Sequence, residues 1–268
     1  MLPILIITAI IIFLYIYMIK PNKKRERTRF FSGYKYAHRG LFDNQGEYPE
    51  NSLSAFKKAK DSGYGVELDV QITADKKVVV FHDGDLKRMC GLDKKLYTLT
   101  YEELCGLTLL NTGERIPLFN EVLELLGDTP IICEIKMHSS YRDLEICKQV
   151  SEILENYSPK LCVESFNPLA IRYFRKNNPE IVRGILSKNF SEERRELGLF
   201  ITFALKNLLL NFLAKPDFIA FRHNDKKCFT FRICKKLYRP LTVAWTVRGK
   251  DEKAPADFDT VIFEGVFT

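Results

Sequence analysis

Two carboxylates and one histidine stand close together in segment 64–83, YGVELDVQITADKKVVVFHD. Glu67 and Asp69 are two residues apart, so a strand would point both carboxylates to the same face. The next apolar run, VVVF, ends in His82 and Asp83. Paired carboxylates beside a strand-end histidine suit a hard divalent cation with an acid/base group next to it. The alternative is an antiparallel hairpin with a solvated acidic face, because a lone E-x-D pair is common.

Charged residues mark two further strand-like runs. The run YKYA at 34–37 leads into His38 and Arg39, and the run IICEIK at 131–136 carries Glu134 and Lys136. The first run is either a strand with solvated ends or a strand that delivers side chains to a site.

Strand-like runs alternate with helical patterns from residue 34 to the C-terminus, which indicates a parallel α/β architecture. No GxGxxG or GKS/T loop follows these runs, so a doubly wound nucleotide-binding sheet is less well supported. Several runs end in polar residues, as expected for a (β/α)8 barrel, whose site gathers residues from many strand ends. We therefore predict a TIM (β/α)8 barrel. The turn between Val70 and Val78 is too short for a helical crossover, so one corner of the barrel should be irregular.

In such a barrel the scattered polar residues would form one site. His38 and His82 would act as general acid and base near neutral pH. Three carboxylates would supply oxygen ligands for Ca²⁺ or Mg²⁺, namely Glu67, Asp69 and Glu134.

Arg39 and Lys136 are the predicted contacts of an anionic phosphate group. A metal, two cations and an acid/base pair around a phosphate describe phosphodiester cleavage. Trp245, the only tryptophan, stands at a predicted strand end. It is either an apolar wall for the alcohol group of the substrate or part of the barrel core. His138 and His223 have no predicted partner and are expected at the surface.

The N-terminus carries an almost unbroken apolar run from Leu2 to Ile19. As a helix its 18 residues would be about 27 Å long, close to the thickness of the hydrocarbon core of a bilayer. A signal peptide would have basic residues before the apolar run and small residues after it, whereas here the bases follow and Tyr15 and Tyr17 stand near the end. We therefore predict an uncleaved transmembrane anchor at 1–19, a basic juxtamembrane linker at 20–33 and a catalytic domain at 34–268.

The basic residues are concentrated next to this run. Of the formal net charge of +7, segment 20–29 contributes +5, from six basic residues and Glu26. The remaining charge of about +2 forms no cluster typical of nucleic-acid binding, so no nucleic-acid partner is expected. The positive-inside rule predicts a single-pass protein of the cell membrane with its catalytic domain on the cytoplasmic side. Residues 1–29 are thus predicted to contact membrane lipids.

Segment 197–213, LGLFITFALKNLLLNFL, is apolar nearly all round. A second membrane span is not expected, because Lys206 would fall in the middle of the helix. The segment is either a buried helix or a helix at the membrane interface that lines an entrance for lipid.

Eight motifs give the chain a family resemblance: HRG (38–40), PENS (49–52), ELDVQIT (67–73), VVVFHD (78–83), IPLFNEVL (116–123), EIK (134–136), ESFNP (164–168) and AWTV (244–247). In this order and spacing they resemble the glycerophosphodiester phosphodiesterase family, from residue 34 to the C-terminus. The resemblance implies a somewhat irregular TIM barrel. It also implies His38 and His82 as the acid/base pair, metal ligands at Glu67, Asp69 and Glu134, and phosphate contacts at Arg39 and Lys136. Glu50, in the PENS motif, is expected to support the site.

The implied reaction converts a glycerophosphodiester and water to glycerol 3-phosphate and an alcohol. The glycerol hydroxyl next to the phosphate would attack first, through a cyclic intermediate, and the two histidines would exchange roles between the steps. Two alternatives remain. One is hydrolysis of lysophospholipids in the manner of a lysophospholipase D, and the other is a non-catalytic module that binds phospholipid headgroups.

Overall fold

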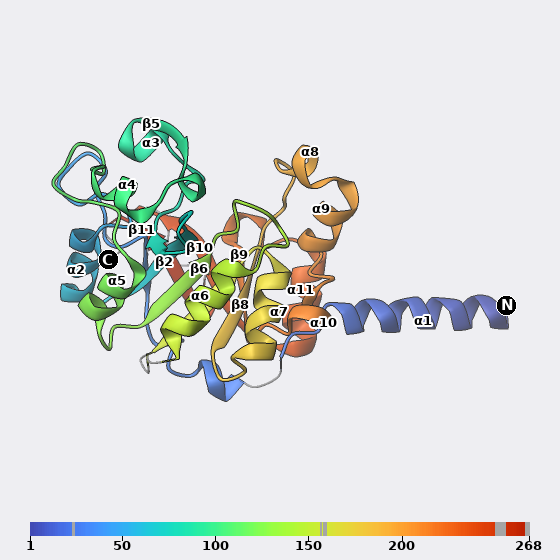
Figure 1. The fold of residues 1–268 in the computed structure, drawn as a ribbon. Helices are drawn as coiled ribbons and strands as arrows, with labels where there is room; N and C mark the ends of the chain where they lie inside the picture. The colour runs from blue at the N-terminus through green and yellow to red at the C-terminus, as the bar shows by residue number, and fades with distance from the viewer. Residues whose placement is uncertain (23–24, 156, 158–159, 250–255, 266–268) are drawn as a thin grey trace.

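Eight parallel strands close into a barrel in the computed structural model, which describes residues 1–268 except 23–24, 156, 158–159, 250–255 and 266–268 (Figure 1). Each strand pairs with the next in parallel, and the strand after the N-terminal region closes the ring by pairing with both the second and the last. The strands are β1 (Tyr36–His38), β2 (Gly65–Ile72), β6 (Ile131–Ile135), β7 (Leu161–Ser165), β8 (Val182–Ser187), β9 (Phe218–Arg222), β10 (Leu241–Arg248) and β11 (Thr260–Glu264). The predicted TIM-type barrel is confirmed.

The expected irregular corner is present next to β2. Strand β3 (Val78–Val80) pairs with β2 in antiparallel fashion, with Val70 opposite Val80, so a hairpin is inserted between β2 and the helix that leads to the next parallel strand. A segment with its own apolar cluster then precedes the next barrel helix. It contains β4 (Asp85–Leu86), α3 (Lys87–Cys90), β5 (Leu92–Lys95), η2 (Leu96–Thr98) and α4 (Tyr101–Cys105).

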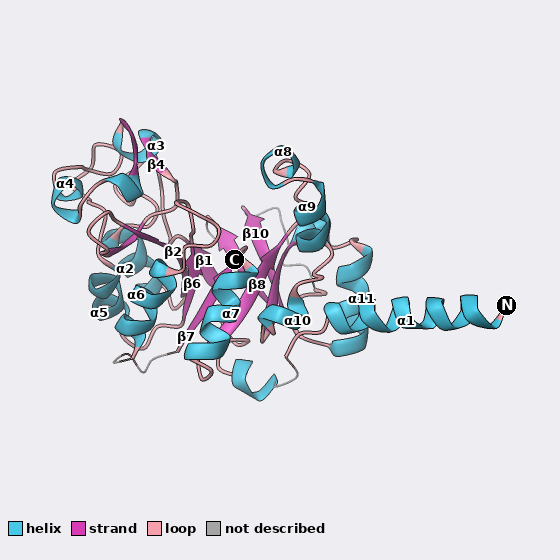
Figure 2. Cartoon of the chain, turned by 45° about the vertical axis from the view of Figure 1, so that its right-hand side comes forward, coloured by secondary structure: helices cyan, strands magenta, loops and turns pink. Residues whose placement is uncertain are grey.

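Helices cover the outside of the barrel (Figure 2). Their apolar faces pack against the strands; in the first of them Ala55, Phe56 and Ala59 are fully buried. The Ser52 hydroxyl caps this helix by accepting a hydrogen bond from the backbone N–H of Ala55, an interaction typical of a serine just before the first helical turn. The main covering helices are α2 (Leu53–Asp61), α5 (Phe119–Leu126), α6 (Glu145–Leu154), α7 (Pro168–Asn177) and α11 (Phe229–Tyr238).

Aromatic side chains fill the barrel toward the amino ends of its strands. The ring of Phe31 lies 4.9 Å from the rings of both Tyr36 and Phe218, and all three are fully buried. Gly184 on β8 faces Phe218, and a Cβ at this position would overlap the Phe218 ring. Residue 184 therefore has to be small. The chain just before β1 thus contributes to the core.

The predicted transmembrane anchor is wrong: among the described residues, no helix combines the length and the apolar character that a membrane crossing needs. Helix α1 (Leu2–Met18) has 17 residues, about 26 Å in length, whereas a span takes about 20 residues. Its last turn also packs on the domain, where Ile19 is fully buried and its carbonyl accepts a hydrogen bond from Asn211. The prediction of a single-pass membrane protein with a cytoplasmic domain, which depended on this anchor, falls with it.

Helix α1 is tied to the barrel by two further hydrogen bonds and otherwise projects from it (Figure 1). The hydroxyls of Tyr15 and Thr230 are 2.7 Å apart, and the Tyr238 hydroxyl donates to the carbonyl of Ile16 at 2.7 Å. The basic segment that follows includes η1 (Arg25–Thr28), and Arg27 donates to the carbonyl of Pro179 at 2.6 Å.

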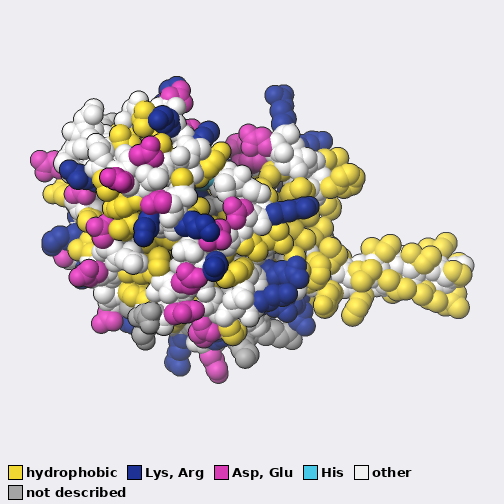
Figure 3. Space-filling model, in the orientation of Figure 1, with side chains coloured by type: hydrophobic (Ala, Val, Ile, Leu, Met, Phe, Trp, Pro, Cys, Tyr) yellow, Lys and Arg dark blue, Asp and Glu magenta, His cyan; other side chains and the backbone are white. Residues whose placement is uncertain are grey.

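Segment 197–213 is not one buried helix. It holds the end of α8 (Arg194–Leu197), α9 (Leu199–Lys206) and the start of α10 (Asn211–Ala214). Helix α9 buries Thr202 and Leu205, but Phe200 is 88% exposed and Leu199 and Phe203 are also exposed. These side chains contribute to the apolar surface of the molecule (Figure 3).

Candidate active site

A cavity of about 140 Å³ lies at the carboxyl ends of the barrel strands. Most residues predicted for the site line it: His38, Arg39, Glu67, His82, Glu134, Lys136 and Trp245. Asp69 and Glu50 are buried and contact these residues. The barrel therefore brings all nine predicted residues together, as the convergence of strand ends requires.

Three carboxylates form the floor of the site. Glu67 and Asp69 project from β2, and Glu134 lies directly opposite Asp69 on β6. One oxygen from each carboxylate lies within 4.8 Å of the others, and all three residues are buried. Burial, together with the charges of Asp69 and Glu134, raises the pKa of Glu67 well above its usual value. The negative charge of the three carboxylates is therefore not fully balanced by cations near Glu67.

Two cations reach this floor from the side. Lys136 Nζ lies 2.7 Å from Glu134 Oε1 and 3.1 Å from Asp69 Oδ1. Arg39 Nε lies 3.4 Å from Asp69 Oδ2. Burial alone would raise the pKa of Asp69, but Lys136 and the other cations outweigh it and hold this pKa well below its usual value. Burial alone would likewise lower the pKa of Lys136, but the two carboxylates raise it, so the ammonium stays charged.

The carboxylate group fits a divalent metal ion. Its three oxygens are close enough to share one ion, and hard oxygen donors are what Ca²⁺ and Mg²⁺ prefer. Asp69 Oδ1 is buried and receives no hydrogen bond of good geometry from the described residues; its charged neighbour is Lys136 Nζ at 3.1 Å. The geometry therefore supports a metal centre of this type, without a preference between the two ions.

Each histidine has a carboxylate on its Nδ1. His38 Nδ1 lies 2.7 Å from Glu264 Oε1, while its Nε2 lies 3.9 Å from Glu67. His82 Nδ1 lies 2.7 Å from Asp83 Oδ1. Burial lowers the pKa of His38, and the hydrogen bond to Glu264 offsets this in part. In both residues the carboxylate on Nδ1 orients the ring and leaves Nε2 as the other nitrogen that can exchange a proton.

Glu50 connects Arg39 to a more distant arginine, Arg88. Its Oε1 accepts hydrogen bonds from Arg39 Nη1 and Arg88 Nη2, each at 2.7 Å. Its Oε2 accepts from Arg88 Nη1 at 2.8 Å and from Asn44 Nδ2 at 2.7 Å. Burial opposes the ionisation of Glu50, but these donors lower its pKa to about 2. The carboxylate is therefore charged at neutral pH and holds Arg39 in place.

An aromatic wall borders the cavity. The rings of Trp245 and Phe166 meet edge to face at 5.4 Å, and Phe166 meets Phe190 in the same way at 5.8 Å. Trp245 is partly exposed and lines the cavity, so it belongs to the site and not only to the barrel core. Its Nε1 receives no hydrogen-bond partner among the described residues.

Four residues around the site had no role assigned from the sequence: Glu164, Phe166, Arg88 and Glu264. Glu164 and Phe166 belong to the ESFNP motif, and Glu164 faces Glu134 across β6 and β7, so a charged residue inside a buried strand was the signal. Glu264 ends the last strand, as polar site residues do elsewhere in the barrel. Arg88 lies in a loop-rich segment and gives no such signal.

His138 and His223 were expected to have no hydrogen-bond partner, but each contacts a backbone carbonyl oxygen. His138 is exposed, but its Nε2 lies 3.2 Å from the carbonyl oxygen of His82. His223 Nε2 lies 3.2 Å from the carbonyl oxygen of Thr246. Neither lines the cavity.

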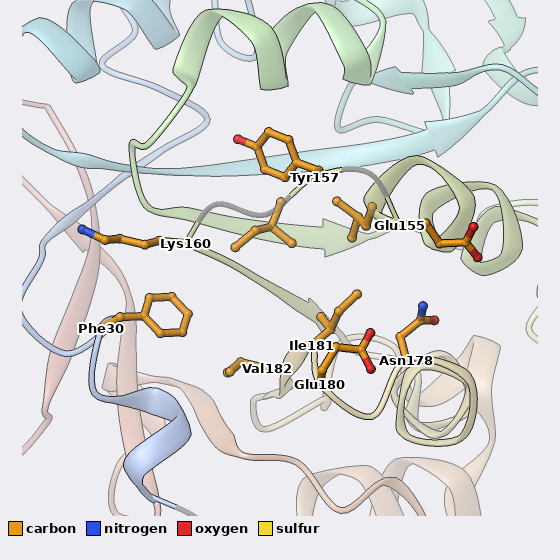
Figure 4. Close-up of a pocket in the computed structure, with 10 residues that line it drawn as sticks. Phe30, Glu155, Tyr157, Lys160, Asn178, Glu180, Ile181 and Val182 are labelled. Atoms are coloured by element: carbon orange, nitrogen blue, oxygen red, sulfur yellow. The ribbon is translucent and has the colours of Figure 1, made fainter.

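A second hollow, of about 770 Å³, lies at the opposite end of the barrel (Figure 4). Its walls include Leu161 and Val182, which begin β7 and β8, together with Phe30 and Tyr157. None of the residues predicted for the active site lines it. Its residues therefore play no part in the chemistry considered below.

Several known proteins are similar to this chain in sequence. A glycerophosphodiester phosphodiesterase from Caldanaerobacter subterraneus is 35% identical over 162 residues, which cover 56% of this chain and 65% of the relative. A protein from Rattus norvegicus named lysophospholipase D GDPD1 is 36% identical over 147 residues, covering 50% of this chain and 44% of that protein. The chain thus spans less than two thirds of the length of these curated relatives.

Solved structures share the fold. The glycerophosphodiester phosphodiesterase of Thermotoga maritima is 27% identical, with a TM-score of 0.61 over 85% of this chain and 92% of that one. An Oleispira antarctica phosphodiesterase, solved in complex with the product sn-glycerol-3-phosphate, is 22% identical, with a TM-score of 0.67 over 86% and 92% of the two chains. Residues 38–261 match the Glycerophosphoryl diester phosphodiesterase family. The chain belongs to that family.

Proposed function

We propose that the protein hydrolyses glycerophosphodiesters to glycerol 3-phosphate and an alcohol, with a divalent metal ion and two histidines. The observation that carries this proposal is the meeting of His38, His82, Lys136 and the three-carboxylate group around one cavity. A site that only bound phosphate would need the cations but no acid/base pair. Membership of the family supports the same reaction class.

Burial makes His38 the natural base for the first step. Its pKa is lowered, so at neutral pH the ring is uncharged and its Nε2 accepts a proton. His38 takes the proton of the glycerol hydroxyl next to the phosphate as the oxygen attacks phosphorus, and His82 donates a proton to the departing alcohol oxygen. A cyclic phosphodiester results. In the second step the roles reverse: His82 takes a proton from water as the water oxygen attacks phosphorus, the P–O bond to the attacking glycerol oxygen breaks, and His38 returns a proton to that oxygen.

Arg39 and Lys136 hold the phosphate during both steps. Lys136 stays charged because Asp69 and Glu134 surround its ammonium, and Arg39 is fixed by Glu50. A divalent ion at Glu67, Asp69 and Glu134 would supply positive charge to the phosphate oxygens as negative charge builds up on them.

The domain boundaries at residues 20 and 34 stay predictions.

Trp245 and Phe166 would form the side of the site that receives the alcohol. An aromatic wall next to the cavity accepts an apolar or amphipathic group without requiring hydrogen bonds from it. A second candidate function therefore has support, namely release of the headgroup from lysophospholipids. The exposed apolar face of α9 follows β8, on the same end of the barrel, and would offer a surface for an acyl chain. The related rat protein bears the name of such an activity.

The test offers glycerophosphocholine and lysophosphatidylcholine to the full chain, side by side. Choline release reports both reactions, and the second product tells them apart, since the first substrate gives glycerol 3-phosphate and the second gives lysophosphatidic acid. Each assay runs with EDTA and then with excess Ca²⁺ or Mg²⁺. His38→Gln and His82→Gln are compared with His223→Gln, which removes a histidine outside the cavity.

We expect turnover of glycerophosphocholine that needs a metal ion and both site histidines, with His223→Gln close to wild type. Turnover of the lysophospholipid alone would favour the second function. Binding of glycerol 3-phosphate without turnover of either substrate would identify a headgroup-binding module instead. Full rates in both site variants would refute the acid/base assignment.

A further inference from the structure

Arg88 makes hydrogen bonds to two carboxylates at once. Its Nε donates to Asp83 Oδ2 at 2.7 Å and its Nη2 donates to Asp83 Oδ1 at 3.1 Å. Its Nη1 and Nη2 donate to the two oxygens of Glu50 at 2.8 and 2.7 Å. The planar guanidinium group thus uses one edge for Asp83 and another for Glu50, a geometry that lysine does not have.

Each of these two carboxylates also contacts a residue that lines the cavity. Asp83 Oδ1 lies 2.7 Å from His82 Nδ1, and Glu50 Oε1 accepts a hydrogen bond from Arg39 Nη1 at 2.7 Å. One continuous chain of charged contacts therefore connects the acid/base histidine to the phosphate-side arginine. Arg88 stands at its centre and does not itself line the cavity.

The segment between β3 and α5 places Arg88. Its neighbour Met89 is 2% exposed and belongs to the apolar cluster of this segment, and the Met89 carbonyl accepts a hydrogen bond from the backbone of Leu110 at 2.7 Å. The Arg88 side chain itself is 45% exposed, so it contributes little to that cluster. Removing the guanidinium group should therefore leave the fold of the segment intact.

We propose that Arg88 is a positioning residue that fixes His82 and Arg39 relative to each other; this inference rests on the proposed function of the site. Through Asp83 it holds the His82 ring in the orientation for proton transfer. Through Glu50 it holds Arg39 where the phosphate binds. Loss of Arg88 should therefore affect both the chemical step and substrate binding, whereas loss of either carboxylate should affect mainly one of them.

The experiment compares Arg88→Ala and Arg88→Lys with Lys87→Ala in the full chain. Lys87 is the matched control, because it lies on the same helix and its exposed ion pair, 3.0 Å from Asp93, makes no contact with the site. Partners that orient reacting groups typically contribute about 10- to 100-fold to activity. We expect kcat/KM to fall by about this factor in Arg88→Ala, to recover only in part in Arg88→Lys, and to stay near wild type in Lys87→Ala.

Two further comparisons distinguish positioning from a general loss of structure. Millimolar guanidinium ion should restore activity to Arg88→Ala several-fold, because the vacated position is partly exposed, and should not affect Lys87→Ala. Asp83→Asn should mainly lower kcat, and Glu50→Gln should mainly raise KM. Wild-type kinetics in Arg88→Ala, or an equal loss in Lys87→Ala, would overturn the proposal.

Two readouts do not depend on turnover. The ¹⁵N spectrum of the His82 ring should change in Arg88→Ala, because its Nδ1 partner is released, and the affinity for sn-glycerol 3-phosphate should fall. If the wild type turns over no substrate, the proposed function fails, while these two readouts still decide the role of Arg88. An unchanged His82 spectrum together with unchanged affinity would refute it in either case.

Discussion

Replacing Glu264 by Gln should slow the reaction and move its pH profile, because this carboxylate both orients His38 and supports its protonated form. Glu264 Oε1 lies 2.7 Å from His38 Nδ1, and Oε2 accepts a hydrogen bond from Arg248 Nε at 2.8 Å. These partners lower the pKa of Glu264 to about 2 although burial opposes this, so the side chain is an anion at every pH of a normal assay.

The size of the effect follows from the kind of bond that is lost. A hydrogen bond to a charged group contributes about 1.5–3 kcal/mol, and about 1.4 kcal/mol corresponds to a factor of ten in rate. We therefore expect kcat/KM to fall between about tenfold and 150-fold. Since the Glu264 side chain is 22% exposed and Gln keeps an acceptor oxygen, the lower end is expected.

The direction of the pH shift can be worked out as well. Burial lowers the pKa of His38 and Glu264 raises it in part, so Glu264→Gln should lower it further. A base that loses its proton at lower pH moves the acidic limb of the kcat/KM profile to lower pH. Asp257→Asn, which removes an exposed carboxylate paired with Lys226, is the control. An unchanged rate, or a limb that moves to higher pH, would refute the reasoning.

Three further predictions concern the metal centre, acid stability and packing. Glu67→Gln should weaken Ca²⁺ or Mg²⁺ binding at least tenfold in calorimetry, because it removes one of three oxygen donors; unchanged affinity would exclude Glu67 as a ligand. Glu50 has its pKa lowered from 4.5 to about 2, so it stabilises the fold fully above pH 4.5, and this contribution, about 3 kcal/mol at most, is lost as the pH falls toward 2. Urea unfolding of Glu50→Gln should therefore show less loss of stability across this range than wild type, and parallel pH dependences would contradict the assignment. Gly184→Ala should cost about 1–3 kcal/mol in the same assay, since its Cβ would overlap the buried Phe218 ring; wild-type stability would show that the ring has room to move.

The barrel was predictable because local patterns determine its elements. Short apolar runs alternate with amphipathic helices, and α2 begins after a serine, Ser52, whose hydroxyl accepts a hydrogen bond from the Ala55 backbone. The short connection between Val70 and Val78 also predicted an irregular corner, which the structure shows as the antiparallel pairing of β2 and β3. Segment 197–213 was not predictable in this way, because its apolar composition does not reveal that the helix breaks and leaves Phe200 exposed.

The apolar N-terminus shows a related limit. Composition alone indicated a membrane span at 1–19, but where a helix ends depends on what its last residues contact. Ile19 is buried against the barrel and Tyr15 bonds Thr230, so the last turn belongs to the domain and the helix is too short for a span. These contacts join residues about 200 positions apart and leave no signal in the N-terminal sequence.

The sequence by itself determined the barrel and the chemical types of the site, because strand periodicity places Glu67 and Asp69 on one face and every parallel strand ends at the same rim. Only the tertiary structure decided which groups hold those residues in place. Glu264 reaches His38 from the last strand, and Arg88 reaches Asp83 and Glu50 from a loop-rich segment. Such contacts depend on how separate elements pack, and neither the spacing of residues nor the composition shows which side chains from different elements come into contact.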